Sequence, residues 1–305
     1  MNIQWYPGHM TKARRAMKED MKLIDLVIEL VDARVPFSSR NPDIDELAAG
    51  TARMVLLNKA DLADEAKNAA WAALFESRGI HVAKIDARNK GSLKQVQAVI
   101  QEACKEKIER DRRRGILNRP IRTMVVGIPN VGKSTFINSF AGKACAKTGN
   151  KPGVTKGNQW IRLNKTLELL DTPGILWPRF EDQTVGLHLA LIGSINDQIL
   201  NREELAWELI GLLEQIYPGV LTERYGDAAE GETEDNSAWK ELSKEEQNLK
   251  ASRMLERIAK NRACLMKGGE LDLARASALL LDEFRSGKLG KLSLEQAQDY
   301  TDRVK

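Results

Sequence analysis

Residues 127–134 read Gly-Ile-Pro-Asn-Val-Gly-Lys-Ser, and the fold of the chain can be inferred from this motif and its surroundings. It fits the pattern GxxxxGK[ST], follows the apolar run Thr123–Val126 and precedes a helical stretch that starts near Gly132. Glycines let backbone N–H groups converge on phosphate oxygens, and the helix N-terminus adds a favourable dipole. Lys133 can bridge β- and γ-phosphates, while Ser134 offers a hydroxyl to Mg²⁺. The stretch predicts a nucleotide-phosphate site, with nucleotide contacts from Asn130, Val131, Gly132, Lys133, Ser134 and Thr135.

Apolar runs with the length and β-branched content of strands recur along the first part of the chain. They are 25–31, 54–57, 81–85, 123–126, 160–163 and 167–170. Helical stretches separate most of them, with capping signals at Asp64 and at Ser92 with Gln95, the latter opening a helix to about Lys107. Strands alternating with helices predict an α/β domain with a mostly parallel, six-stranded sheet.

The pattern becomes helical after Pro178, and no convincing strand follows. The expected helices are 183–193, 201–215, 243–266, 271–286 and 293–303, with capping boxes at Ser243/Glu246 and Ser293/Gln296. We therefore expect two domains, an α/β domain over residues 1–180, which includes a basic segment 1–22, and a smaller all-α domain over residues 181–305.

The composition indicates an ordinary globular protein of 305 residues, with 42% hydrophobic and 30% charged residues. The three cysteines, Cys104, Cys145 and Cys264, lie far apart without a CxxC pair, which argues against a disulfide framework or a zinc cluster. No apolar run approaches the ~18–20 residues that span a bilayer. We expect a cytoplasmic protein without a membrane partner.

Positive charge is concentrated in one part of the chain. The net charge is only +4, yet residues 112–167 hold twelve basic residues and no acidic one. Further along, Lys250, Arg253, Arg257 and Lys260 fall on one face of the helix expected at 243–266. Such surfaces favour contact with nucleic-acid phosphates, and a merely solvated face is the alternative.

The base is indicated by Asn58-Lys59-Ala60-Asp61, directly after the run 54–57. A carboxylate at Asp61 can accept from the ring N–H and the exocyclic amine of guanine together. Adenine presents an acceptor at the first position and lacks the second donor, so it would leave a buried charge unpaired. These four residues therefore favour a guanine nucleotide.

A third motif, Asp171-Thr172-Pro173-Gly174, follows the run 167–170. Asp171 is placed to hold Mg²⁺ through water, and the Gly174 amide can reach a γ-phosphate. The loop 147–155 has the glycine and proline content of a mobile switch, and its Thr155 can complete the metal site with Ser134. Together the three motifs predict a site for GTP and Mg²⁺.

The order of these motifs is unusual, because the guanine motif precedes the phosphate loop and DTPG comes last. With the opening Trp5-Tyr6-Pro7-Gly8-His9-Met10 and GIPNVGKS, the chain resembles the circularly permuted GTPases of the YlqF type, which are ribosome biogenesis GTPases. The resemblance implies a permuted P-loop GTPase fold, a role in late assembly of the large ribosomal subunit, and a C-terminal domain that contacts ribosomal RNA.

The second guanine loop of such proteins is usually Ser-Ala-Lys, and here it reads Asp86-Ala87-Arg88. The Ala87 backbone contact transfers to this pattern, and Asp86 is a second candidate contact. The residue after DTPG is Ile175, which cannot orient water as a glutamine does. The resemblance suggests His9 in that role, beside Lys133 and Thr155, and K⁺ at Asn130.

We expect a monomeric GTPase that is slow alone, is stimulated by the ribosome, and whose GTP or GDP state controls association with the pre-ribosomal particle. One alternative is an RNA-binding scaffold in which GTP is a slowly turned-over structural ligand. A metabolic P-loop kinase is a weaker alternative, because the guanine motif argues against it.

Overall fold

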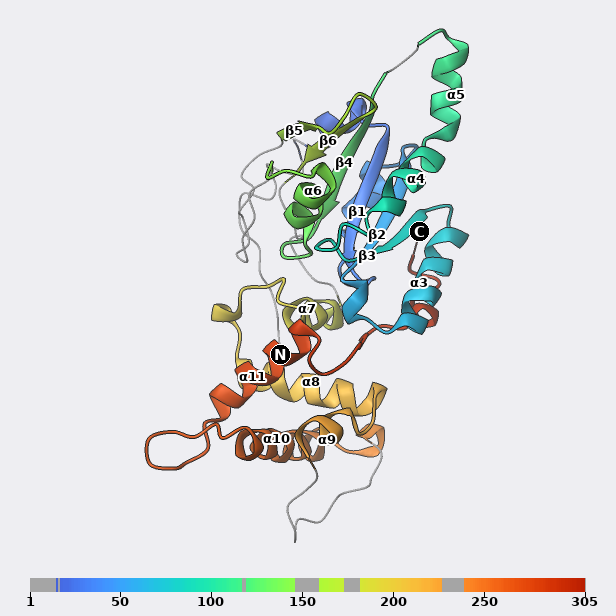
Figure 1. Ribbon diagram of the computed structural model, residues 1–305. Helices are drawn as coiled ribbons and strands as arrows, with labels where there is room; N and C mark the ends of the chain where they lie inside the picture. Colours follow the sequence, from blue (N-terminus) through green and yellow to red (C-terminus); the bar gives the residue numbers. More distant parts are fainter. Residues whose placement is uncertain are drawn as a thin grey trace. The chain divides into compact units, whose positions relative to one another are not determined.

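Six strands form one sheet in the order β3-β2-β1-β4-β6-β5. The computed structural model describes residues 15, 17–116, 119–145, 159–172, 182–226 and 239–304 (Figure 1). The strands are β1 (Leu26–Asp32), β2 (Ala52–Asn58), β3 (His81–Ile85), β4 (Ile121–Gly127), β5 (Gln159–Arg162) and β6 (Leu167–Asp171). Neighbours are parallel except β5, which pairs antiparallel with β6. The expected six-stranded, mostly parallel sheet is confirmed.

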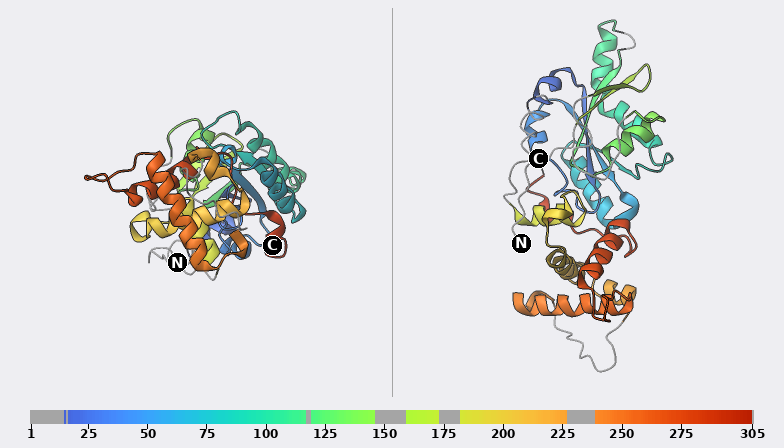
Figure 2. Two further views of the ribbon diagram at one scale, coloured as in Figure 1. Left: turned by 90° about the horizontal axis from the view of Figure 1, so that it is seen from below. Right: turned by 90° about the vertical axis from the view of Figure 1, so that its left-hand side faces the viewer.

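The middle of the sheet is covered on both faces. All seven residues of β1 are buried, which is why its sequence is a nearly continuous apolar run rather than an alternating one. Helices α3 (Glu65–Ser77) and α4 (Lys94–Ala103) pack near β2 and β3, and α6 (Lys133–Ala141) packs on β4 (Figures 1 and 2).

The central pair β1 and β4 marks a change of direction in the sheet. From β1 the chain moves outward to β2 and β3, whereas after β4 it continues on the other side, first to the edge strand β5 and then back to β6 beside β4. In open α/β sheets ligands bind beyond the carboxyl ends of the strands at such a switch point. The phosphate loop leaves β4 at this place.

The remaining helices of the sheet region are α2 (Asp43–Leu47), α5 (Lys105–Arg113), the 3₁₀ turns η1 (Met21–Leu23) and η2 (Ala60–Leu62), and the start of α7 (Gln183–Leu191). Asp64 caps α3 as expected, with its side chain accepting from the N–H groups of Ala66 and Lys67. The expected capping of the next helix by Ser92 with Gln95 was wrong, because α4 begins after Leu93 and has no side-chain cap. Ser92 Oγ instead donates to the carbonyl of Asp86 at 2.7 Å, and two helices occupy the place of one.

The C-terminal part is helical, with α8 (Arg202–Ile216), α9 (Val220–Tyr225), α10 (Lys244–Asn261), α11 (Leu273–Ser286) and the short turns η3 (Asp197–Ile199), η4 (Trp239–Glu241) and η5 (Ala297–Tyr300). Helices α8, α10 and α11 pack against one another around buried leucines such as Leu209, Leu255 and Leu280. Within the described residues no helix is both long and apolar enough to cross a membrane.

Local signals again succeed where tertiary contacts do not compete. Ser243 and Glu246 form the expected capping box of α10. The box at Ser293 and the helix 293–303 were wrong, because the Ser293 N–H donates to Tyr217 Oη at 3.0 Å and the segment keeps only the turn η5. The helix expected at 243–266 ends earlier, at Asn261, so Leu265 lies beyond the end of α10, and it is 48% exposed.

Backbone contacts divide the chain into a sheet unit, Asn2–Leu189 with Glu295–Lys305, and a helical unit, Ala190–Leu294. The boundary expected from the sequence lay at residue 180. The structure places the start of α7 and the last eleven residues with the sheet, so the helical unit is an insertion with two connections to the sheet unit.

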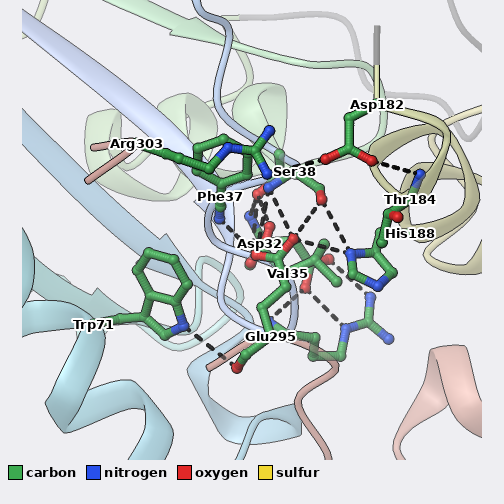
Figure 3. Close-up of polar contacts among 12 residues, drawn as sticks. Asp32, Val35, Phe37, Ser38, Trp71, Asp182, Thr184, His188, Glu295 and Arg303 are labelled. Carbon is green, nitrogen blue, oxygen red and sulfur yellow. Dashed lines mark hydrogen bonds and ion pairs between the residues drawn. The ribbon is translucent and has the colours of Figure 1, made fainter. Parts of the chain in front are cut away.

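Glu295 fastens this returning C-terminal segment to the sheet unit (Figure 3). Its carboxylate is 1% exposed and accepts from the N–H groups of Phe37 at 2.7 Å and Ser38 at 3.0 Å. The Ser38 hydroxyl also donates to it, and His188 Nδ1 of α7 lies 3.0 Å away. A buried carboxylate is tolerated here because several hydrogen-bond partners surround it.

Aromatic packing holds the rest of the segment. The ring of Tyr300 stacks on Phe37 with centroids 4.4 Å apart and lies 5.6 Å from Trp71. Ala297 and Val304 join the core formed by Val31, Leu57 and their neighbours. Arg303 donates to Asp182 at 3.0 Å, just before α7. The last residues are therefore part of the sheet unit's core.

We predict that Glu295→Ala lowers the free energy of unfolding of the sheet unit by about 3 kcal/mol, because buried donors on Phe37 and Ser38 lose their acceptor. Urea unfolding followed by circular dichroism measures this. Gln296→Ala, at the exposed neighbouring position, is the matched control and should change little. Equal effects of the two substitutions would refute the fastening role of Glu295.

Candidate functional site

Two glycines shape the loop between β4 and α6. A Cβ on Gly127 would lie 2.9 Å from the Leu30 carbonyl oxygen and from Val131 Cγ1. Gly132 has φ +96°, and a Cβ there would collide with the side-chain amide nitrogen of Asn58. Only glycine satisfies both positions, so the loop brings its backbone close to β1 and to the guanine motif.

Asn58, at the end of β2, joins three loops. Its Nδ2 donates to the Val131 carbonyl at 2.7 Å, and its Oδ1 accepts from the Ala87 N–H at 2.9 Å. The side chain is nearly fully buried, so these hydrogen bonds are costly to lose. One amide thus holds the phosphate loop and both guanine loops in register.

Lys59 adds a second connection. It adopts φ +60°, a strained conformation for lysine, and its Nζ donates to Asp32 at 2.9 Å and to the Asn130 carbonyl at 3.2 Å. Asp32 is fully buried, and its Oδ2 also accepts a hydrogen bond from Arg34 Nη2 at 2.8 Å. Burial acts to raise the pKa of Asp32, but the charges and hydrogen bonds of Arg34 and Lys59 outweigh it and hold the pKa well below its usual value.

Lys133 and Asp171 face one another where α6 begins. Lys133 Nζ donates to Asp171 Oδ1 at 2.7 Å and also to the Thr172 carbonyl, while Thr172 Oγ1 donates to the Val125 carbonyl at 2.8 Å. Burial lowers the pKa of Lys133, and Asp171 partly offsets this. The contact places Asp171 beside the first turn of α6, which carries Ser134.

This donor set fits Mg²⁺. The described residues hold no cluster of three or more His, Cys, Asp or Glu side chains that could cage a metal. Mg²⁺ needs no such cage, since it keeps several waters and combines one or two protein oxygens with substrate phosphates. The hydroxyl of Ser134 and the carboxylate of Asp171 are ligands of that kind.

In the loop after β3, Arg88 lies between two carboxylates. Its Nη2 donates to Asp61 Oδ2 at 2.6 Å, and its Nε donates to Asp86 Oδ1 at 2.9 Å. The Arg88 N–H also donates to Asp86 Oδ1 at 2.9 Å. The Asp86 carboxylate thus holds Arg88. The Ala87 N–H is instead bound by Asn58, and Asp61 lies three residues after Asn58 in the same motif.

The structure brings most of the expected residues to one edge of the sheet. They are Asn58 at the end of β2 with Lys59, Ala60 and Asp61 after it, Asp86 and Ala87 after β3, Asn130 to Thr135 around the start of α6, and Asp171 at the end of β6. His9, Thr155 and Gly174 lie outside the described residues. Sequence reasoning missed Asp32 and Arg34, although a polar Asp-Ala-Arg at the carboxyl end of a predicted strand could have been noticed.

The chain is similar to known proteins. Residues 122–212 match the profile of a family described as 50S ribosome-binding GTPase. A ribosome biogenesis GTPase A of Bacillus cereus is 47% identical over 304 residues, covering all of this chain and 97% of that protein. The chain belongs to the ribosome biogenesis GTPase A family, also called YlqF. A GTPase A of Thermotoga maritima is 31% identical over 299 residues, which are 98% of this chain and 96% of that protein.

The crystal structure of GNP-bound YlqF from T. maritima has a TM-score of 0.62 and 26% identity, covering 94% of this chain and 99% of that one. As a family member the chain has the permuted P-loop GTPase fold, and it is a GTPase of ribosome biogenesis. GTPases of this fold depend on Mg²⁺.

We predict that Asp32→Asn lowers the free energy of unfolding by about 3 kcal/mol near neutral pH, because Arg34 and Lys59 lose a buried counter-charge. A carboxyl with a lowered folded-state pKa stabilises above its unfolded pKa and stops doing so as the pH falls. The deficit should therefore stay constant from about pH 5 to 8 and shrink below about pH 4.

Urea titrations across this pH range provide the measurement. Asp302→Asn, at an exposed position of the same unit, is the control and should show no deficit. A deficit that grows as the pH falls would contradict the assigned charge network.

Proposed function

We propose that this chain is a GTP-hydrolysing assembly factor for the large ribosomal subunit, and that its GTP or GDP state controls its association with the pre-ribosomal particle. The observation that supports a guanine-nucleotide switch best is the Asn58 amide, which fastens both guanine loops to the phosphate loop. The named relatives support the ribosomal setting, among them a mitochondrial ribosome-associated GTPase 1 of Xenopus tropicalis, 34% identical over 234 residues.

In the proposed site the base lies at Asp61 and Ala87, and the phosphates lie on the backbone N–H groups at the start of α6. Lys133 exchanges the Asp171 carboxylate for a phosphate oxygen when nucleotide binds. Ser134, Asp171 and Thr155 would hold Mg²⁺, whose positive charge would offset the negative charge of the phosphates. Gly174 contacts the γ-phosphate, and His9 positions the water.

Few residues separate the DTPG motif from the helical unit along the chain. Helix α7 begins at Gln183, twelve positions after Asp171, and the boundary between the two units falls within it, after Leu189. We propose that loss of the γ-phosphate shifts the start of α7 and changes the affinity of the helical unit for ribosomal RNA.

Exposed positive charge supports the choice of an RNA partner. In α5 and just after it, Arg112, Arg113 and Arg114 are exposed, and in α10 Arg253 and Lys260 are exposed. The apolar side of α10, with Ala251, Leu255 and Ile258, is buried. On the basic face Lys250 and Arg257 are half-buried, and Lys250 Nζ lies 5.8 Å from the centroid of the Trp239 ring. We propose a cytoplasmic monomer that binds RNA phosphates through these faces.

We predict that large ribosomal subunits stimulate GTP hydrolysis tenfold or more, about 1.4 kcal/mol or more of barrier lowering. Steady-state phosphate release in potassium buffer, with and without subunits, measures this. The stimulation should vanish in His9→Ala and in Lys133→Ala. Intact GTP binding without any stimulation would instead favour an RNA-binding scaffold with GTP as a structural ligand.

We also propose that Asn130 holds K⁺, whose charge stabilises the transition state where an arginine finger otherwise acts. Hydrolysis by the wild-type chain should be about tenfold faster in K⁺ than in Na⁺ of similar ionic strength. Asn130→Ala should remove the difference between the two salts while GDP still binds. Equal wild-type rates in both salts would refute the role of K⁺.

A further inference from the structure

The guanidinium of Arg88 is held by two carboxylates, those of Asp86 and Asp61. Asp86 receives both Nε and Nη2 of Arg88, at 2.9 and 3.3 Å, a side-on pair that fixes the plane of the guanidinium. With that plane fixed, Nη2 also meets Asp61 Oδ2 at 2.6 Å. The orientation of Asp61 therefore depends on Arg88, and that of Arg88 depends on Asp86.

The backbone under Arg88 is anchored as well. The preceding Ala87 is buried, and its N–H donates to Asn58 Oδ1 at 2.9 Å. Ser92 Oγ accepts from the Asp86 N–H at 3.2 Å and donates to the Asp86 carbonyl at 2.7 Å. The loop thus presents Arg88 from a fixed position rather than from a free surface turn.

We propose that Arg88 is a positioning residue for guanine: held by Asp86, it orients the Asp61 carboxylate toward the base and sharpens the preference for guanine over bases without the 2-amino group. This inference rests on the proposed function, in which Asp61 receives the base. It also explains why the second guanine loop carries Asp-Ala-Arg, since Asp86 serves Arg88 instead of the base.

Hydrogen-bond capacity allows Arg88 and guanine to share Asp61. A carboxylate has about four lone-pair sites, and guanine requires two of them for its ring N–H and its amine. Arg88 takes a site on Oδ2 alone, and Oδ1 accepts no hydrogen bond from the described residues. The arginine can therefore remain in place while the base binds.

The exposure of the pair points to orientation rather than stability. The side chains of Arg88 and Asp61 are 65% and 35% exposed, and exposed ion pairs add little to fold stability. An unheld Asp61 would be free to rotate and would lose side-chain freedom when guanine binds. Fixing it beforehand lowers that cost of binding.

The experiment compares dissociation constants for GDP and IDP by calorimetry or fluorescence titration, because the hypoxanthine of IDP lacks the 2-amino group. For Arg88→Ala we expect GDP to bind about fivefold more weakly, which corresponds to about 1 kcal/mol. IDP binding should weaken less, so the ratio of the IDP dissociation constant to the GDP dissociation constant falls. Arg88→Lys should recover only part of the ratio, because a lysine cannot hold both carboxylates in a fixed plane.

Two further variants separate position from charge. Asp86→Asn should change the ratio in the same direction as Arg88→Ala, since it releases the guanidinium. Lys90→Ala removes an exposed positive charge from the same loop and should leave both constants unchanged. An unchanged ratio in Arg88→Ala, or tighter GDP binding that reveals competition between Arg88 and the base, would overturn the inference.

Asp61→Asn distinguishes a failure of the Arg88 inference from a failure of the proposed guanine site. Xanthine carries a carbonyl where guanine carries the amine, so the variant should prefer XDP to GDP. If it does and Arg88→Ala behaves like Lys90→Ala, only the role of Arg88 is overturned. If it does not, the base site is wrongly placed and both the inference and the proposed guanine site are overturned.

Discussion

The proposed nucleotide site depends on one buried amide, that of Asn58. Its two hydrogen bonds reach Val131 in the phosphate loop and Ala87 in the second guanine loop, groups that are far from it along the chain. Permutation is compatible with this arrangement because a parallel sheet brings the carboxyl ends of β2, β3 and β4 to one edge whatever their order in the sequence. The fold needs the strands side by side, and the chain order is secondary.

The sheet was predictable because its signals are local and redundant. Each strand is a short apolar run, and the caps at Asp64 and Ser243 use side chains within one helical turn. The caps proposed at Ser92 and Ser293 failed because partners elsewhere captured these residues. The return of the C-terminal segment to the sheet unit had no local signal, since Glu295 is bound by residues more than 250 positions away.

The chemistry of the site was predictable to the level of its motifs. Phosphate loop, guanine motif and Asp171 were each recognisable from spacing, and the sheet brings them together. The pairing between charged side chains could not be predicted from the sequence, because it depends on the directions of side chains on different strands and loops. Asp32 holds Lys59 in place, and Arg88 connects Asp61 to Asp86, which the sequence offered only as a candidate contact to the base. Buried or shared charges of this kind become visible only with coordinates.

The most direct test of the account is a crystal structure of the chain with GDP and Mg²⁺. The account predicts the guanine against Asp61 and the Ala87 N–H, the β-phosphate on the backbone of Gly132 to Ser134, and the Asn58 amide still joining Val131 to Ala87. A phosphate at the start of α6 with the base directed away from Asp61 would contradict the claim that the permuted motifs form one guanine-nucleotide site.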